Sequence, residues 1–148
     1  MPNPLTITQN IAIQATPEAI FKILADVEHW HLWTASIKKI VLINNTVLGP
    51  GVSAKVFQPR LLPNVWKVIQ YEENRSFTWV SKSPGLTMTA GHALSPGDNH
   101  TAVSLTMTYE GFLAKLLYKM TANLTSQYMT MEIEGLKKVC EQRPSGTN

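Results

Sequence analysis

Cysteine and charge are both scarce in this sequence. It has one cysteine, Cys140, and Asp, Glu, Lys and Arg make up only 16% of its 148 residues. A single cysteine excludes an intramolecular disulfide and a cysteine-rich zinc site. No apolar run approaches the length of a membrane span, so no integral membrane segment is expected. The first residues lack the basic and apolar regions of a signal peptide, and we expect a cytoplasmic location.

The basic residues are scattered rather than clustered. The net charge is +3, and the only basic doublets are Lys38-Lys39 and Lys137-Lys138. A nucleic-acid-binding domain usually carries a basic stripe or cluster, so no nucleic-acid partner is expected. Apolar residues make up 44% of the chain, which favours a folded protein over a disordered one. The length predicts a single domain over residues 1–148.

The first thirty residues predict one strand and two short helices. Residues 5–14 include β-branched residues in partial alternation, which is typical of a strand. Thr16-Pro17-Glu18 then predicts a helix start, with a threonine cap, proline in the first turn and an acid near the positive helix end. We expect this helix to end, or to continue as a second short helix, around residues 26–28.

The middle of the chain predicts strands that are separated by turn residues. Hairpin-length gaps between consecutive strands indicate an antiparallel meander. The six strands are expected at 38–43, 52–58, 64–72, 76–82, 86–94 and 101–110.

A long helix is predicted from about Gly111 to about Glu141, followed by a flexible tail at 142–148. The expected fold is therefore α+β, with a curved antiparallel sheet of about seven strands wrapped around a long C-terminal helix. The inward stripe of this helix is predicted as Leu113, Leu117, Met120, Leu124, Tyr128, Met131 and Gly135.

The aromatic stretch at 26–33, DVEHWHLW, raises the question of a metal or catalytic site. His29 and His31 are two residues apart and would point in different directions from a helix, so they cannot share one metal ion. We interpret the stretch as a helix end rather than a catalytic site. No metal and no cofactor are predicted.

The order of these segments resembles the START-like, or Bet v 1-like, helix-grip superfamily (SRPBCC), and most closely its bacterial polyketide cyclase/dehydrase-type branch. The resemblance covers nearly the whole chain. It implies a hydrophobic cavity between sheet and helix that binds lipids, sterols, polyketides, hormones or quinone-like molecules. The matching segments are 15–21, Asp26 with Trp30 and Trp33, 66–68, 76–80, 92–94, 101–103 and Gly111.

His92 is the histidine with the clearest functional potential. Alternation places it with Met88 on the apolar, inward face of its strand, and Tyr109 on the neighbouring strand is a candidate hydrogen-bond partner. One interpretation is a wall residue that orients a ligand. The other is a general acid or base, because histidine titrates near neutral pH. His92 and Tyr109 are the weak catalytic candidates.

We expect the protein to bind a small hydrophobic molecule. We also expect it to be a monomer or a homodimer. One alternative is an enzyme of cyclase or dehydratase type that uses His92. Another is a protein-interaction domain of chaperone-regulator type that uses the outer sheet face. A further alternative is that the inward-facing side chains fill a solid core and leave no cavity. The predicted ligand-binding residues are Trp66, Phe77, Trp79, Met88, His92, Leu105, Tyr109, Met120 and Leu124.

Overall fold

One antiparallel sheet and one long helix dominate the computed structural model, which describes residues 5–142. The sheet has seven strands in the order β1-β7-β6-β5-β4-β3-β2. Strands β2 to β7 each pair with their neighbours in sequence, and β1 pairs with β7. The strands are β1 (Leu5–Ile13), β2 (Lys39–Leu42), β3 (Ser53–Phe57), β4 (Asn64–Glu72), β5 (Ser76–Ser83), β6 (Leu86–Gly97) and β7 (His100–Glu110). This arrangement confirms the predicted α+β helix-grip fold.

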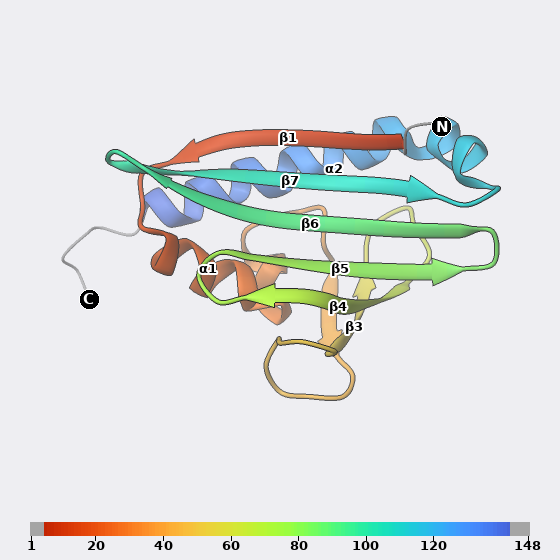
Figure 1. Ribbon diagram of the computed structural model, residues 1–148, viewed down its shortest axis with the longest axis horizontal. Coiled ribbons are helices and arrows are strands. Elements are labelled where there is room, and N and C mark those ends of the chain that lie inside the picture. Colours follow the sequence, from red (N-terminus) through yellow and green to blue (C-terminus); the bar gives the residue numbers. More distant parts are fainter. Residues whose placement is uncertain (1–4, 143–148) are drawn as a thin grey trace.

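Two short helices follow β1, as the sequence predicts. The helix α1 (Pro17–Ala25) is capped by Thr16, whose hydroxyl accepts a hydrogen bond from the Ala19 N–H at 3.1 Å. A 3-10 helix, η1 (Val27–Leu32), continues directly from it. Both lie behind the sheet near the C-terminal end of the long helix (Figure 1).

The long helix α2 (Ala114–Gln142) has 29 residues and spans about 44 Å. It runs behind the sheet along most of the sheet's length, starting beyond the end of β7 and ending near α1 (Figure 1). Gln142 is the last residue of α2, and the rest of the predicted flexible tail lies outside the described residues.

The predicted inward stripe of α2 is wrong in part. Met120 is 70% exposed and Met131 is 36% exposed, whereas Thr125 and Met129 are buried. The stripe was chosen by hydrophobicity, but apolar residues lie on both the buried and the exposed side of this helix, and Thr125 is among the buried residues. The buried residues of α2 are Ala114, Thr125, Tyr128, Met129, Ile133, Leu136 and Cys140.

An aromatic cluster between η1, β4, β5 and β6 forms part of the core. Trp30 and Trp79 are 5.8 Å apart between ring centroids, and Trp66 and Trp79 are 6.0 Å apart. Trp30 also donates its indole N–H to the Leu24 carbonyl oxygen at 2.9 Å, so its polar atom is satisfied although the residue is only 2% exposed. The cluster fixes η1 against the sheet.

Gly135 of α2 lies against Trp33, the residue that follows η1. A Cβ atom at this position would collide with the Trp33 carbonyl oxygen. Glycine is therefore required here by close backbone approach. The contact positions the C-terminal half of α2 against the end of η1.

Candidate functional site

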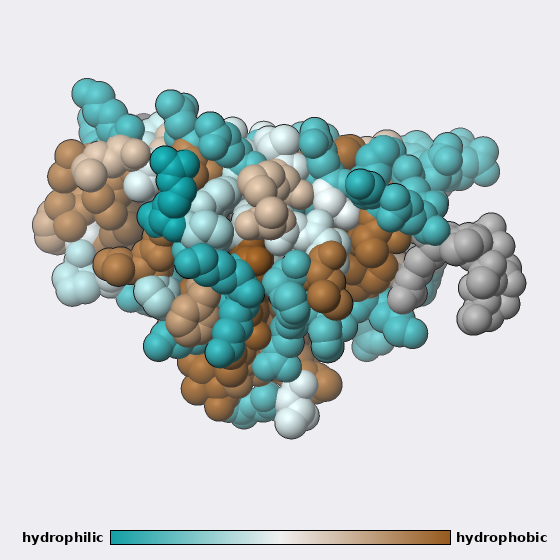
Figure 2. Space-filling view, turned by 180° about the vertical axis from the view of Figure 1, so that it is seen from behind, coloured by the Kyte–Doolittle hydropathy of each residue, from teal (hydrophilic) through white to brown (hydrophobic). Residues whose placement is uncertain are grey.

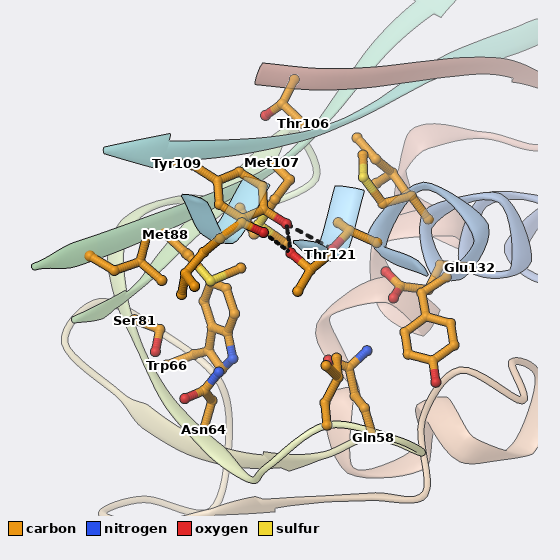
Figure 3. Close-up of a pocket in the computed structure, with 18 of the residues that line it drawn as sticks. Gln58, Asn64, Trp66, Ser81, Met88, Thr106, Met107, Tyr109, Thr121 and Glu132 are labelled. Atoms are coloured by element: carbon orange, nitrogen blue, oxygen red, sulfur yellow. Dashed lines mark hydrogen bonds between the residues drawn. The ribbon is translucent and has the colours of Figure 1, made fainter. Parts of the chain in front are cut away.

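A cavity of about 420 Å³ lies between the inner face of the sheet and the N-terminal and central turns of α2. The segment at 58–64, which leads from β3 into β4, lines another side of the cavity. Apolar wall residues come from the sheet and from α2, among them Trp66, Leu86, Met88, Met107 and Leu117. Figure 3 shows that polar side chains also reach the cavity, at separate places on its wall.

The structure brings five of the nine predicted site residues together on the cavity wall: Trp66, Met88, His92, Leu105 and Tyr109. Phe77 and Trp79 belong instead to the adjacent aromatic cluster. Leu124 is partly exposed and does not line the cavity, and the placement of Met120 on its wall is wrong. The helix phase explains this correction, because Thr121 and Thr125 occupy the wall positions that were assigned to Met120 and Leu124.

Three hydroxyl groups form a polar cluster on the wall. The Tyr109 hydroxyl lies 2.8 Å from Thr125 Oγ1 and 3.1 Å from Thr121 Oγ1 (Figure 3). Thr121 donates to the Leu117 carbonyl oxygen at 2.7 Å, one turn back along α2. The sequence analysis missed both threonines because isolated threonines on a helix give no signal of their own until the helix phase is known.

His92 does not use Tyr109 as its partner, and that prediction is wrong. The strand register pairs His92 with Leu105 and Met88 with Tyr109. The His92 Nδ1 atom lies instead 3.1 Å from the Phe77 carbonyl oxygen, and the two rings stack with centroids 4.1 Å apart. A carbonyl oxygen only accepts, so Nδ1 carries the proton of the neutral ring.

Burial of His92 lowers its pKa to about 4, and the hydrogen bond to Phe77 raises it only in part. The imidazole is therefore neutral at pH 7. A neutral ring with Nδ1 protonated keeps a lone pair on Nε2, which is suited to accepting a hydrogen bond. A group with this pKa is a poor general acid near neutral pH.

Glu132 is a wall residue that the sequence analysis missed. Ser36 donates its hydroxyl to Glu132 Oε2 at 3.4 Å, a long hydrogen bond. The ion pairs found within residues 5–142 do not include this carboxyl group. Burial raises its pKa to about 7, and the Ser36 hydrogen bond lowers it by less. Figure 3 shows the carboxyl group directed toward the open space beside Thr121.

No residue of the stretch at 26–33 lines the cavity. The His29 Nδ1 atom is 2.9 Å from an Asp26 carboxylate oxygen, and this exposed hydrogen bond raises the pKa of His29. Trp30 is buried, while Trp33 is only partly buried. Glu28 accepts a hydrogen bond from the Leu42 N–H at 2.9 Å, which ties η1 to β2. These contacts give the stretch a packing role.

No group of three His, Cys, Asp or Glu side chains within the described range is arranged to hold a metal ion. In that same range, no helix combines the length and apolarity needed to span a membrane.

A seven-stranded antiparallel sheet packed against a long C-terminal helix, with two short helices after the first strand, is the helix-grip fold. The chain belongs to the polyketide cyclase / dehydrase and lipid transport family, whose sequence model matches residues 4–141. A search of curated proteins found no match.

Solved structures share this fold at low sequence identity. An aromatase/cyclase (Zhui) from a Streptomyces species superposes with a TM-score of 0.79 at 12% identity, over 99% of each chain. A hypothetical protein from Helicobacter pylori gives 0.79 at 16% identity, over 92% of this chain and 88% of that one. A START superfamily protein from Mycobacterium smegmatis gives 0.70 at 16% identity, over 90% and 97%. Identities this low show a common fold.

Proposed function

We propose that this protein binds one small, mostly apolar molecule in the cavity between the sheet and α2. The observation that carries the proposal is the cavity itself, which has a volume of about 420 Å³ and a largely apolar wall with a few polar groups. Small-molecule sites in proteins have this character and volumes of roughly 300–1,000 Å³. A lipid-, polyketide- or quinone-like molecule suits such a space.

The polar groups of the wall would orient this ligand. Thr121, in the hydroxyl cluster, and Glu132 are separated by about three turns of α2, or about 16 Å. His92 adds a hydrogen-bond acceptor, and Arg60 is an exposed cation at the edge. Glu132 has spare acceptor capacity, so a hydroxyl or amino group on the ligand is favoured beside it.

The family match supports this assignment at the level of class, because its description names both a cyclase / dehydrase activity and lipid transport. The likeness to an aromatase/cyclase adds that the same fold serves an enzyme elsewhere. Fold alone does not choose between these functions. The monomeric or dimeric state and the cytoplasmic location stay predictions.

The test is a titration with an apolar naphthalene dye, together with native mass spectrometry of the freshly purified protein. We expect micromolar dye binding and a co-purified molecule of lipid size. Thr121→Trp fills the cavity and should abolish dye binding, whereas Asn123→Trp, on the exposed side of the same helix, should leave it intact. Absence of dye binding by the wild type, or equal loss in both variants, would contradict the proposal.

An enzyme remains the second candidate, and Glu132 is the observation that favours it. A wall carboxyl group with a pKa near 7 is suited to exchanging a proton at neutral pH, which His92 is not. Glu132 would therefore replace His92 as the acid or base of a cyclase- or dehydratase-type reaction. Loss of turnover by roughly 10²–10⁴ in Glu132→Gln, with ligand binding kept, would support this candidate.

The outer sheet face gives little support to a protein-interaction function. Its central strands present threonines such as Thr87, Thr89 and Thr108 rather than a contiguous apolar patch. Four exposed apolar residues, Leu62, Phe112, Leu116 and Met120, lie instead on the segments that border the cavity.

A further inference from the structure

An exposed apolar ridge lies along the beginning of α2. Phe112 is 86% exposed, Leu116 is 54% exposed and Met120 is 70% exposed. Leu116 and Met120 are four residues apart and share one side of α2, and Phe112 lies in the turn just before the helix. Figure 2 shows hydrophobic residues gathered at the end of the molecule where α2 begins, at the left of the view. Isolated apolar residues are common on protein surfaces, but a ridge of large ones indicates a binding surface.

The ridge borders the cavity entrance. Phe112 packs on the β5–β6 turn, where a Cβ atom added to Gly85 would lie 2.8 Å from the Phe112 ring. The neighbouring residue Leu86 lines the cavity, together with Leu117 of α2. Leu62, from the segment at 58–64, lines the same cavity and is 87% exposed. We call Leu62, Phe112, Leu116 and Met120 the entrance patch.

The charges around the entrance patch are almost all positive. Lys115 and Lys119 form an exposed row beside the ridge on α2. Arg60 and Lys82 are exposed on the other two segments that border the cavity, 58–64 and the β5–β6 hairpin. No acidic residue occurs between Glu28 and Glu72 or between Glu110 and Glu132. Glu110 is therefore the one acid next to the patch within the described chain.

We propose that the entrance patch docks this protein on the surface of an anionic lipid bilayer. The four apolar side chains would enter the interface, and the surrounding lysines and arginine would lie among the anionic headgroups. Apolar residues adjacent to a basic row are the pattern of helices that lie in a membrane interface. A second copy of this chain carries the same positive charge at its own patch, so like-charge repulsion opposes self-association there.

Docking would place the cavity entrance at the membrane surface, where apolar molecules are concentrated. The inference extends the proposed function, but it does not depend on which molecule the cavity holds. The experiment therefore measures vesicle binding separately from dye binding.

The test is co-flotation of the full chain with vesicles of phosphatidylcholine, alone or mixed with phosphatidylglycerol. We expect binding to the anionic vesicles that is at least about tenfold stronger than to the neutral ones and that is weakened by salt. Leu62→Ser/Phe112→Ser and Lys115→Glu/Lys119→Glu should each reduce it by at least about tenfold.

Matched controls carry the same changes at other exposed positions. Val65→Ser/Ile69→Ser removes apolar side chains from β4 that are 48% and 58% exposed, and Lys38→Glu/Lys39→Glu reverses a distant basic pair. Both controls should float like the wild type. Failure of the wild type to bind anionic vesicles, or equal loss in patch and control variants, would overturn the proposal. So would dimerisation on a sizing column that only the patch variants abolish.

Discussion

The two halves of the space between sheet and α2 are built differently. In one half, η1 places Trp30 against Trp79 and His92, and the C-terminal half of α2 adds Ile133 and Leu136, all closely packed. In the other half, the same sheet faces the beginning and middle of α2 across a cavity of about 420 Å³. One half is filled and the other is hollow.

The difference follows from which elements cover the sheet. The helix α1 lies near the C-terminal half of α2 (Figure 1), and buried side chains of α1 and η1, such as Leu24 and Trp30, belong to the core there. No corresponding helix covers the other half in the described structure. There, α2 presents short hydroxyl side chains, Thr121 and Thr125, between larger ones such as Leu117 and Met129. The filled half is therefore expected to stabilise the fold, and the hollow half is the proposed binding site.

The largest expected effect concerns the filled half. Trp30→Ala should lower the free energy of unfolding by about 3–5 kcal/mol, because it removes a buried indole and its hydrogen bond to Leu24. Met107→Ala, in the hollow half, should cost at most about half as much, since this side chain already borders empty space. Urea denaturation of both variants makes the comparison. Equal losses would mean that the two halves do not differ in packing.

A smaller effect, dependent on pH, concerns Glu132. Burial raises the pKa of this carboxyl group from 4.5 in the unfolded chain to about 7 in the folded protein. The folded state thus holds this proton more tightly. The group's contribution to stability is complete below pH 4.5 and is lost as the pH rises through 7. Glu132→Gln cannot ionise and should be more stable than the wild type at pH 8, by about 1–3 kcal/mol.

At pH 4.5 the two proteins should differ little, because both side chains are then neutral. His92 has the opposite pH dependence, since its lowered pKa makes the folded state less stable as the pH falls from 6.5 toward 4. It is present in both proteins and cancels in the difference. Ser36, Gln58, Arg60 and Tyr128 are the other polar groups near this part of the cavity. A difference that does not change with pH would show that Glu132 is not held neutral by burial.

The smallest expected effect concerns His92, which lies at the boundary between the two halves. His92→Gln keeps a hydrogen-bonding group at the wall, so affinity for the naphthalene dye or a natural ligand should fall by no more than about 0.5–1.5 kcal/mol. Isothermal titration calorimetry of both proteins measures the change in affinity. A loss of catalytic turnover without a change in affinity would instead make His92 an acid or base.

The sequence predicted the sheet side of the cavity better than the helix side. Alternation along β6 and β7 placed Met88, His92, Leu105 and Tyr109 on the inner face, because strand period and burial agree there. On α2 the apolar pattern led to Met120, which lies on the surface. A helix whose apolar residues face both the core and an exposed patch has no unique apolar side, so its rotation could not be derived from hydrophobicity.

Glu132 was missed for the same reason. A glutamate on a long helix is usually exposed, and only the correct rotation of α2 turns this one toward the sheet. The partner of His92 was missed because it is a backbone carbonyl group, that of Phe77, which leaves no signature in the sequence.

The proposal that the hollow half is the binding site is tested most directly by observing the methionine side chains. Met88, Met107 and Met129 line the cavity, whereas Met120 and Met131 lie outside it. The measurement is a methyl NMR spectrum of ¹³C-methionine-labelled protein during titration with the naphthalene dye. We expect the Met88, Met107 and Met129 signals to shift together while the Met131 signal stays in place. Shifts confined to Met120, or no shifts at saturating dye, would contradict the account.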